Sequence, residues 1–103
     1  MTELDVQNLI RCGVSDIALI FRANVGQGFT MDGRKFSTGL PKGFSDLFGF
    51  RISDGKAFFI EVKSPTGKIR PEQQNFIDRM RQNGALAGIA RSVEDARKII
   101  LEE

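Results

Sequence analysis

The sequence predicts one α/β domain, residues 1–103, in which helices flank a mixed central β-sheet. Apolar runs of strand length alternate with amphipathic helix patterns in the order helix, strand, glycine-rich hairpin, two strands, helix, strand and helix. A tight turn at Ser53–Gly55 separates two of these strands, so we expect them to pair antiparallel. The length is sufficient for one hydrophobic core and leaves no room for a second.

Composition excludes several classes of protein. The chain is 41% hydrophobic and 27% charged, and no window reaches the length of a membrane span, so we expect a globular protein without membrane association. Its amino terminus lacks the basic and apolar regions of a secretory signal. A single cysteine, Cys12, precludes an internal disulfide and fits the reducing cytoplasm. The net charge of +2 is mildly basic and by itself gives only weak support for nucleic-acid binding.

Missing residue types narrow the possible chemistry. The chain has no His and no Tyr, which excludes zinc fingers, histidine acid/base catalysis and tyrosine-nucleophile strand transfer. Any metal site must use oxygen ligands, which suit Mg²⁺, Mn²⁺ or Ca²⁺. Gly26 and Gly28 superficially suggest a dinucleotide-binding loop, but Met31 occupies the third glycine position and no helix pattern follows. We therefore expect no nucleotide cofactor.

The first helix is expected to begin after Thr2, which can cap it, and to end at Gly13. Its apolar stripe places Glu3 on the side that faces the domain. The alternative to a functional role is that Glu3 is simply an acid in the first turn, where the helix dipole favours negative charge.

A strand is predicted from Asp16 to Arg22, apolar on both sides as expected of a strand that is covered on both faces. Residues 25–43 are glycine-rich and polar, with a turn signal at Met31–Arg34 between two short strand patterns, 28–30 and 35–37. We expect this segment to form a hairpin arm.

The next two strands, 44–51 and 55–63, are joined by the tight turn, which places the start of the first opposite the end of the second. Asp46 and Glu61 should therefore be neighbours. An Asp at a strand entrance is also a common turn former, so this residue alone does not decide between site and turn.

The remaining elements are a helix from Pro71 to Asn83, a strand over 85–90 and a last helix that Ser92 caps. Gln73 precedes the apolar stripe of the first of these helices by three and four residues, which places its amide on the face turned towards the sheet.

Glu61 and Lys63 project from the same face of their strand because side chains alternate with a period of two. A simple strand-end ion pair is one interpretation. The expected convergence of Glu3, Asp46 and Glu61 favours another, since packed carboxylates repel one another unless a hard divalent cation lies between them. Beside such an ion, Lys63 can orient water, stabilise negative charge or act as a base, and the sequence leaves these roles open.

These residues resemble the PD-(D/E)xK nuclease superfamily, and the fuller pattern is similar to its VRR-NUC branch. Ser45 stands where the superfamily name has Pro, a position at which VRR-NUC members vary. The matching stretches are Glu3-x-x-x-Gln7, Phe21-Arg22-x-Asn24-x-Gly26, Gly39-Leu-Pro-Lys-Gly-Phe-Ser-Asp46, Ile60-Glu-Val-Lys-Ser-Pro-Thr-Gly67, Gln73 and Ala90-Arg91-Ser92.

The resemblance implies a restriction-endonuclease-like core with the hairpin as an added arm. It implies that Asp46, Glu61 and the Val62 carbonyl bind Mg²⁺ or Mn²⁺, with Glu3 acting through water or on a second ion. Lys63 would be the catalytic lysine, and Gln73 would orient that lysine or a phosphate. A larger set would line the approach of DNA, where glycines permit close backbone contact and cations neutralise phosphates. These residues are Arg22, Asn24, Lys42, Gly43, Lys68 and Arg70.

Stand-alone chains of this branch resemble Holliday-junction resolvases, so the implied function is a homodimeric, structure-selective DNA endonuclease of repair or recombination in a bacterial or phage-infected cell. Two equivalent cuts in a four-way junction match a two-fold enzyme. Nine Phe residues are more than a small core easily hides, and some are expected at a dimer interface. The alternatives are a general or end-directed nuclease and a non-catalytic nucleic-acid-binding domain.

Overall fold

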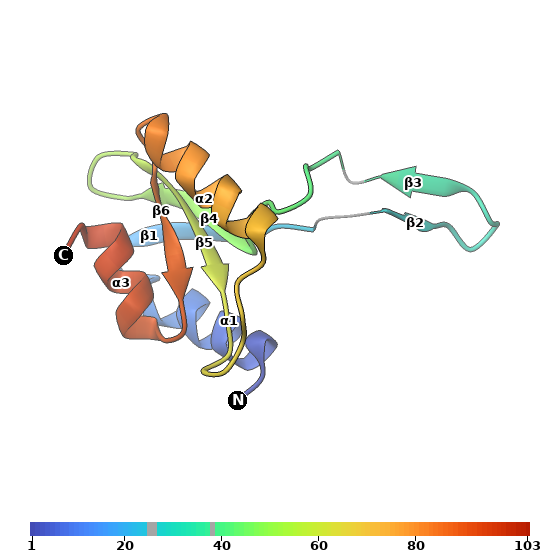
Figure 1. Cartoon of the computed structure of the whole chain (residues 1–103). Coiled ribbons are helices and arrows are strands. Elements are labelled where there is room, and N and C mark those ends of the chain that lie inside the picture. Colours follow the sequence, from blue (N-terminus) through green and yellow to red (C-terminus); the bar gives the residue numbers. More distant parts are fainter. Residues whose placement is uncertain (25–26, 38) are drawn as a thin grey trace.

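A computed structural model describes residues 1–24, 27–37 and 39–103 of the protein, and it confirms the predicted α/β class (Figure 1). The elements follow one another in the predicted order. They are α1 (Glu3–Gly13), β1 (Ala18–Arg22), β2 (Gln27–Phe29), β3 (Lys35–Ser37), β4 (Leu47–Arg51), β5 (Ala57–Val62), α2 (Pro71–Gln82), β6 (Leu86–Ala90) and α3 (Val93–Leu101).

The central sheet has four strands in the order β1-β4-β5-β6. β4 pairs antiparallel with both β1 and β5, whereas β5 and β6 are parallel, so the sheet is mixed as predicted. The β4–β5 turn contains Gly55 with φ of 75°, a left-handed conformation that glycine adopts without strain. In the β4–β5 register Leu47 lies opposite Ile60, which places Asp46 beside the end of β5.

The helix starts agree with the capping signals in the sequence. Thr2 Oγ1 accepts a hydrogen bond from the Asp5 backbone N–H at 3.1 Å, and the Asp5 carboxylate accepts one from the Thr2 N–H at 3.0 Å. Ser92 Oγ accepts from the Asp95 N–H at the start of α3. These contacts satisfy backbone donors that a helix leaves free in its first turn. In the described residues, no helix is long and apolar enough to cross a membrane.

The hydrophobic core lies on the face of the sheet that α1 and α3 cover. β5 contributes Phe58, Ile60 and Val62, each 0% exposed. They meet Ile10 of α1 and Ile100 of α3. Because strand side chains alternate, the residues between them point to the opposite face, where α2 packs against β5 and β6 (Figure 1).

The prediction that the first strand is covered on both faces is wrong. β1 is an edge strand, and Leu19 and Phe21 are 49% and 48% exposed on the face that carries α2. Phe50, the β4 partner of Leu19, is 39% exposed. α2 lies over the other edge of the sheet, so the apolar pattern of β1 reflects one covered face and one open face.

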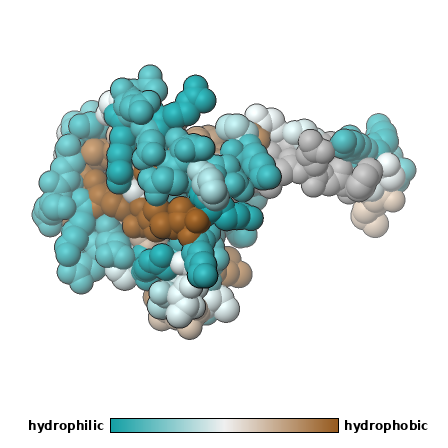
Figure 2. Space-filling view, in the orientation of Figure 1, coloured by the Kyte–Doolittle hydropathy of each residue, from teal (hydrophilic) through white to brown (hydrophobic). Residues whose placement is uncertain are grey.

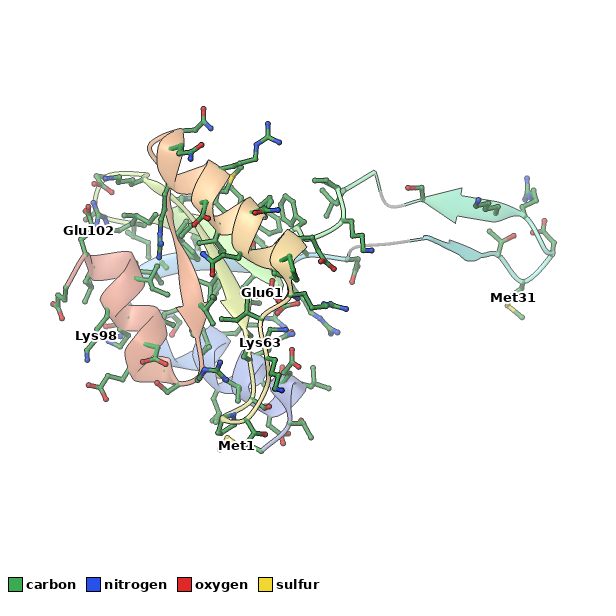
Figure 3. The ribbon with its side chains drawn as sticks, viewed as in Figure 1. Met1, Met31, Glu61, Lys63, Lys98 and Glu102 are labelled. Carbon is green, nitrogen blue, oxygen red and sulfur yellow. The ribbon has the colours of Figure 1, made fainter. Side chains whose placement is uncertain are left out.

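The strands β2 and β3 form an antiparallel arm that projects away from the body (Figure 1). Its turn is closed by a hydrogen bond from the Gly33 N–H to the Thr30 carbonyl at 2.9 Å, as the turn signal predicts. Met31 is fully exposed at the tip (Figure 3). Figure 2 shows a pale brown patch at the same end of the arm. The predicted arm also includes Val25, Gly26 and Thr38, which lie outside the described residues.

Candidate active site

The candidate site lies at the end of β5, between the first turn of α2 and α1 (Figure 3). Glu61 projects to the face opposite the Phe58–Ile60–Val62 core and is 2% exposed. Lys63 follows the strand directly and is 5% exposed. An acid and an amine are therefore both buried, a placement that destabilises the fold unless each charge has a partner.

The contacts do not support a simple ion pair between these two residues. Glu61 Oε1 accepts a hydrogen bond from Gln73 Nε2 at 2.9 Å, while Glu61 Oε2 is buried without a hydrogen-bond partner. Within the described ranges, Lys63 forms no ion pair with any acid. A buried carboxylate oxygen without a partner is rare in folded proteins, and it marks a place where a further group can bind.

Asp46 lies at the junction of three strands. Its Oδ2 accepts a hydrogen bond from the Val62 N–H at 2.9 Å, and its backbone carbonyl accepts one from the Ala23 N–H at 2.9 Å. Asp46 and Glu61 are neighbours as expected, since Asp46 bonds the residue that follows Glu61 and both side chains line one cavity. The side chain is therefore held against β5 beside Glu61.

The pKa of Glu61 is raised to about 8, first of all because burial disfavours the charged form. The neighbouring Asp46 carboxyl raises this pKa further, because it lies beside Glu61 and its charge repels a second negative charge, and Glu3 adds a smaller repulsion. Lys63 opposes the shift, since its positive charge favours the carboxylate. A divalent cation would remove the same repulsion that holds the Glu61 proton.

The donor set fits a hard divalent cation such as Mg²⁺ or Mn²⁺. Asp46 and Glu61 offer neighbouring carboxylate oxygens, one of them without a partner, which are the ligands such ions prefer. The expected three-acid cluster does not form, because no group of three or more Asp, Glu, His or Cys side chains is placed to hold an ion in the described part of the chain. Glu3 is exposed in the first turn of α1, not on the inward side as expected from the apolar stripe, and its charge acts on Glu61.

Gln73 contacts Glu61 in the structure, whereas the resemblance implies that it orients Lys63 or a phosphate. Its amide nitrogen donates to Glu61, and its Oε1 accepts a hydrogen bond from the Arg70 backbone N–H at 3.0 Å. The prediction that Gln73 lies on the face of α2 turned towards the sheet is confirmed, since its side chain is buried with 5% exposure. The side chain therefore fixes the orientation of Glu61 rather than that of Lys63.

A cavity of about 390 Å³ opens onto these side chains. It brings Asp46, Glu61 and Gln73 together with five of the six predicted DNA-binding residues. Lys63 and the sixth, Lys68, are not part of its lining. The five are Arg22, Asn24, Lys42, Gly43 and Arg70.

The loop before β4 is seated on α2 by Gly43, which has φ of 89°. A Cβ atom added there would lie 2.4 Å from the backbone carbonyl oxygen of Glu72. Only glycine permits this approach, so the wall of the cavity depends on it. Glu72, which the sequence did not single out as a site residue, also lines the cavity.

Arg91 is a residue whose role the sequence did not reveal, although its segment resembles the family pattern. Its Nη1 donates to the carbonyls of Ser64 and Gly67, at 2.6 and 2.8 Å. A Cβ added at Gly67 would lie 3.5 Å from Lys63 Cδ, so the clamped turn packs beside the lysine stem. Arg91 thereby fixes the backbone that follows Lys63. Its distance in sequence, 24 to 27 residues from its partners, hides this contact from local patterns.

Comparison with known proteins agrees with this geometry. The model of the VRR-NUC domain family matches residues 7–94. A solved structure described as a VRR_NUC domain shares the fold with a TM-score of 0.65 at 24% identity, covering 98% of this chain and 97% of that one. Among curated proteins, the sequence finds no match. Since the family model spans most of the chain, from α1 to the first turn of α3, the chain belongs to the VRR-NUC domain family, a family of nuclease domains.

Proposed function

We propose that the protein is a divalent-metal-dependent DNA endonuclease that hydrolyses phosphodiester bonds. The observation that carries this proposal is the unpartnered Oε2 of Glu61, buried beside Asp46 and within reach of the charge of Lys63. Neither an inert core nor a simple ion pair explains an acid with a pKa near 8 at the base of a cavity.

Asp46 and Glu61 would hold Mg²⁺ or Mn²⁺ with the backbone carbonyl of Val62, and Glu3 would act through water or on a second ion. When bound, such an ion polarises a phosphodiester and acidifies water. Gln73 keeps Glu61 Oε1 in place, so that Oε2 is the oxygen left to the ion. The Val62 N–H likewise fixes Asp46 through Oδ2.

Lys63 is the residue available for proton transfer or charge stabilisation at the reacting phosphate. Burial holds its ammonium away from competing water, and no acid in the described ranges neutralises it by direct contact. Arg22, Lys42 and Arg70 line the cavity and supply positive charge for the DNA backbone. Together these groups favour an anionic substrate.

We further propose that the enzyme is a homodimer that prefers four-way junctions. The open part of the sheet supports this, since Leu19, Phe21 and Phe50 leave an apolar surface in water. Phe21 packs on Phe48, which packs in turn on Phe44 in the cavity wall, so this surface is continuous with the site. A monomeric mass in light scattering at micromolar concentration would contradict the dimer.

The nuclease proposal is tested with a labelled four-way junction, a matched linear duplex and a matched single strand. Each is incubated with Mg²⁺, with Mn²⁺ and with chelator. We expect metal-dependent cleavage that favours the junction and is lost in Glu61→Ala and Lys63→Ala. Equal activity in chelator would overturn the metal-dependent mechanism.

Two other outcomes separate the remaining functions. Equal cutting of linear duplex and junction would indicate a general nuclease. Cutting only at strand ends would indicate an end-directed nuclease. Binding without any cutting, under every metal condition, would indicate a non-catalytic nucleic-acid-binding domain.

A further inference from the structure

A second cavity, of about 510 Å³, lies along α2 and shares Lys42 and Glu72 with the candidate active site. The two cavities are therefore neighbours, separated by these two side chains. The second is lined mainly by residues of α2 that have no part in the site described above. Its distinctive side chains are Asn75, Phe76, Arg79, Met80 and Asn83.

The charges around this cavity are unbalanced towards positive. Among the residues that the structure describes, Lys42 and Arg79 form no ion pair, whereas the carboxylate of Glu72 has Arg70 at 3.8 Å. Arg70 belongs to the first cavity. The lining thus carries two cations that form no ion pair and one acid that does, and this excess of positive charge attracts an anion such as a phosphate group.

Two side chains of the cavity lining, Phe76 and Met80, are large and apolar. Phe76 is 8% exposed and packs on Phe44 with ring centroids 4.7 Å apart and on Phe59 at 5.6 Å. Met80 lies one turn further along α2 and borders the same cavity. Apolar and cationic side chains in one lining match a nucleotide, whose sugar and base are largely apolar on their faces and whose phosphate is charged.

Size and position agree with one nucleotide of a longer strand. The volume is within the range of about 300–1,000 Å³ typical of small-ligand sites. Lys42 borders both cavities and can contact the backbone on either side. The polar group of Asn75 supplies a neutral hydrogen-bonding partner beside the two cations.

We propose that the cavity formed by Lys42, Asn75, Phe76 and Arg79 binds the nucleotide next to the cleaved phosphodiester of a DNA strand. This subsite rests on the proposed nuclease function, because it assigns a neighbour to the bond cut in the first cavity. It makes α2 both the support of Glu61, through Gln73, and the surface that guides the strand.

The test measures binding of a labelled four-way junction in chelator, where the DNA stays intact, over a series of salt concentrations. For Arg79→Ala we expect about tenfold weaker binding and a fall of about 0.9 in the slope of log K against log salt, the loss of one phosphate contact. Asn75→Ala should weaken binding without changing the slope, since the asparagine side chain carries no charge. Arg11→Ala, an exposed arginine in the last turn of α1, is the matched control and should leave both unchanged.

A second arm locates the contact on the DNA. Single phosphates near the cut are replaced, one at a time, by uncharged methylphosphonates. In the wild type, neutralising the linkage next to the cut should weaken binding, and in Arg79→Ala the same replacement should have no further effect. The subsite would be overturned if methylphosphonate replacement weakened binding of the wild type and of Arg79→Ala at the same positions and to the same extent. A change of the salt slope in Arg11→Ala as large as in Arg79→Ala would also overturn it. Failure of the wild type to cut any DNA would instead overturn the proposed function. The salt series measures binding in chelator, so its result does not depend on cutting.

Discussion

The two sets of side chains that alternate along β5 are almost equally buried but differ in chemical character and in what they contact. Phe58, Ile60 and Val62 are 0% exposed and pack into the core with α1 and α3. On the other face, Glu61 and Lys63 are 2% and 5% exposed under α2, with one carboxylate oxygen left without a partner. One strand thus contributes to the core on one side and to the candidate active site on the other, and burial alone does not separate the two.

The largest expected effect concerns the polar face. Glu61→Gln should abolish metal-dependent cleavage, because the uncharged amide cannot serve as an anionic ligand. The same variant should fold at least as well as the wild type without metal, since it removes a buried ionisable group. Cleavage assays and urea denaturation of the same preparation measure the two properties. Wild-type cleavage rates in this variant would contradict the assignment of Glu61.

The opposite result is expected one residue earlier. Ile60→Ala should lower the free energy of unfolding by about 2–5 kcal/mol, through lost burial and a cavity in the core. The folded fraction should still cut DNA, because Ile60 points away from the site. Urea denaturation gives the stability, and cleavage rates normalised to folded protein give the activity. A normalised rate that falls as far as in Glu61→Gln would show that the two faces are not independent.

The pH dependence of stability should also distinguish the faces. The pKa of Glu61 in the folded protein is about 8, above its ordinary value of 4.5, so the native state binds the proton more tightly than the unfolded state does. In the metal-free protein, the contribution of Glu61 to the free energy of unfolding should therefore be complete below about pH 4.5 and be lost as pH rises through 8. The loss should amount to at most a few kcal/mol.

Urea denaturation of the metal-free wild type between pH 5 and pH 9, with Glu61→Gln as the control, measures this loss. The variant should lack this part of the pH dependence. For the same reason, Mn²⁺ should bind more tightly as pH rises towards 8, because binding must displace the proton. Parallel stability curves for the two proteins would contradict a raised Glu61 pKa.

The smallest effect is expected from the residue that only positions Glu61. Gln73→Ala should reduce cleavage about ten- to a hundredfold, since partners of metal-binding side chains have effects of this size. Gln74→Ala is the matched control, because the next amide along the helix bonds Asp78 and faces away from Glu61. Metal titration should show weaker Mn²⁺ binding in Gln73→Ala alone. Equal losses in the two variants would indicate a general effect on α2.

Local patterns predicted the elements well because their causes are local. Thr2 and Ser92 satisfy helix donors three residues away, and Gly55 permits the tight turn between β4 and β5. The neighbourhood of Asp46 and Glu61 also followed from the sequence, since a short hairpin determines which residues lie opposite each other. Strand boundaries differed by up to three residues, as at β4, where Ser45 Oγ bonds the Leu47 carbonyl before the ladder begins.

By itself, then, the sequence determined the order of the elements, the family resemblance and the residues Asp46, Glu61, Lys63 and Gln73 as a group on neighbouring elements. Only the tertiary structure decided which face each element covers. It placed α2 over β5 and β6 and left β1 open, it directed Gln73 to Glu61 rather than Lys63, and it kept Glu3 apart from the other two acids. Such outcomes depend on how helices pack across the sheet, and the contacts that set this packing join residues far apart in the chain.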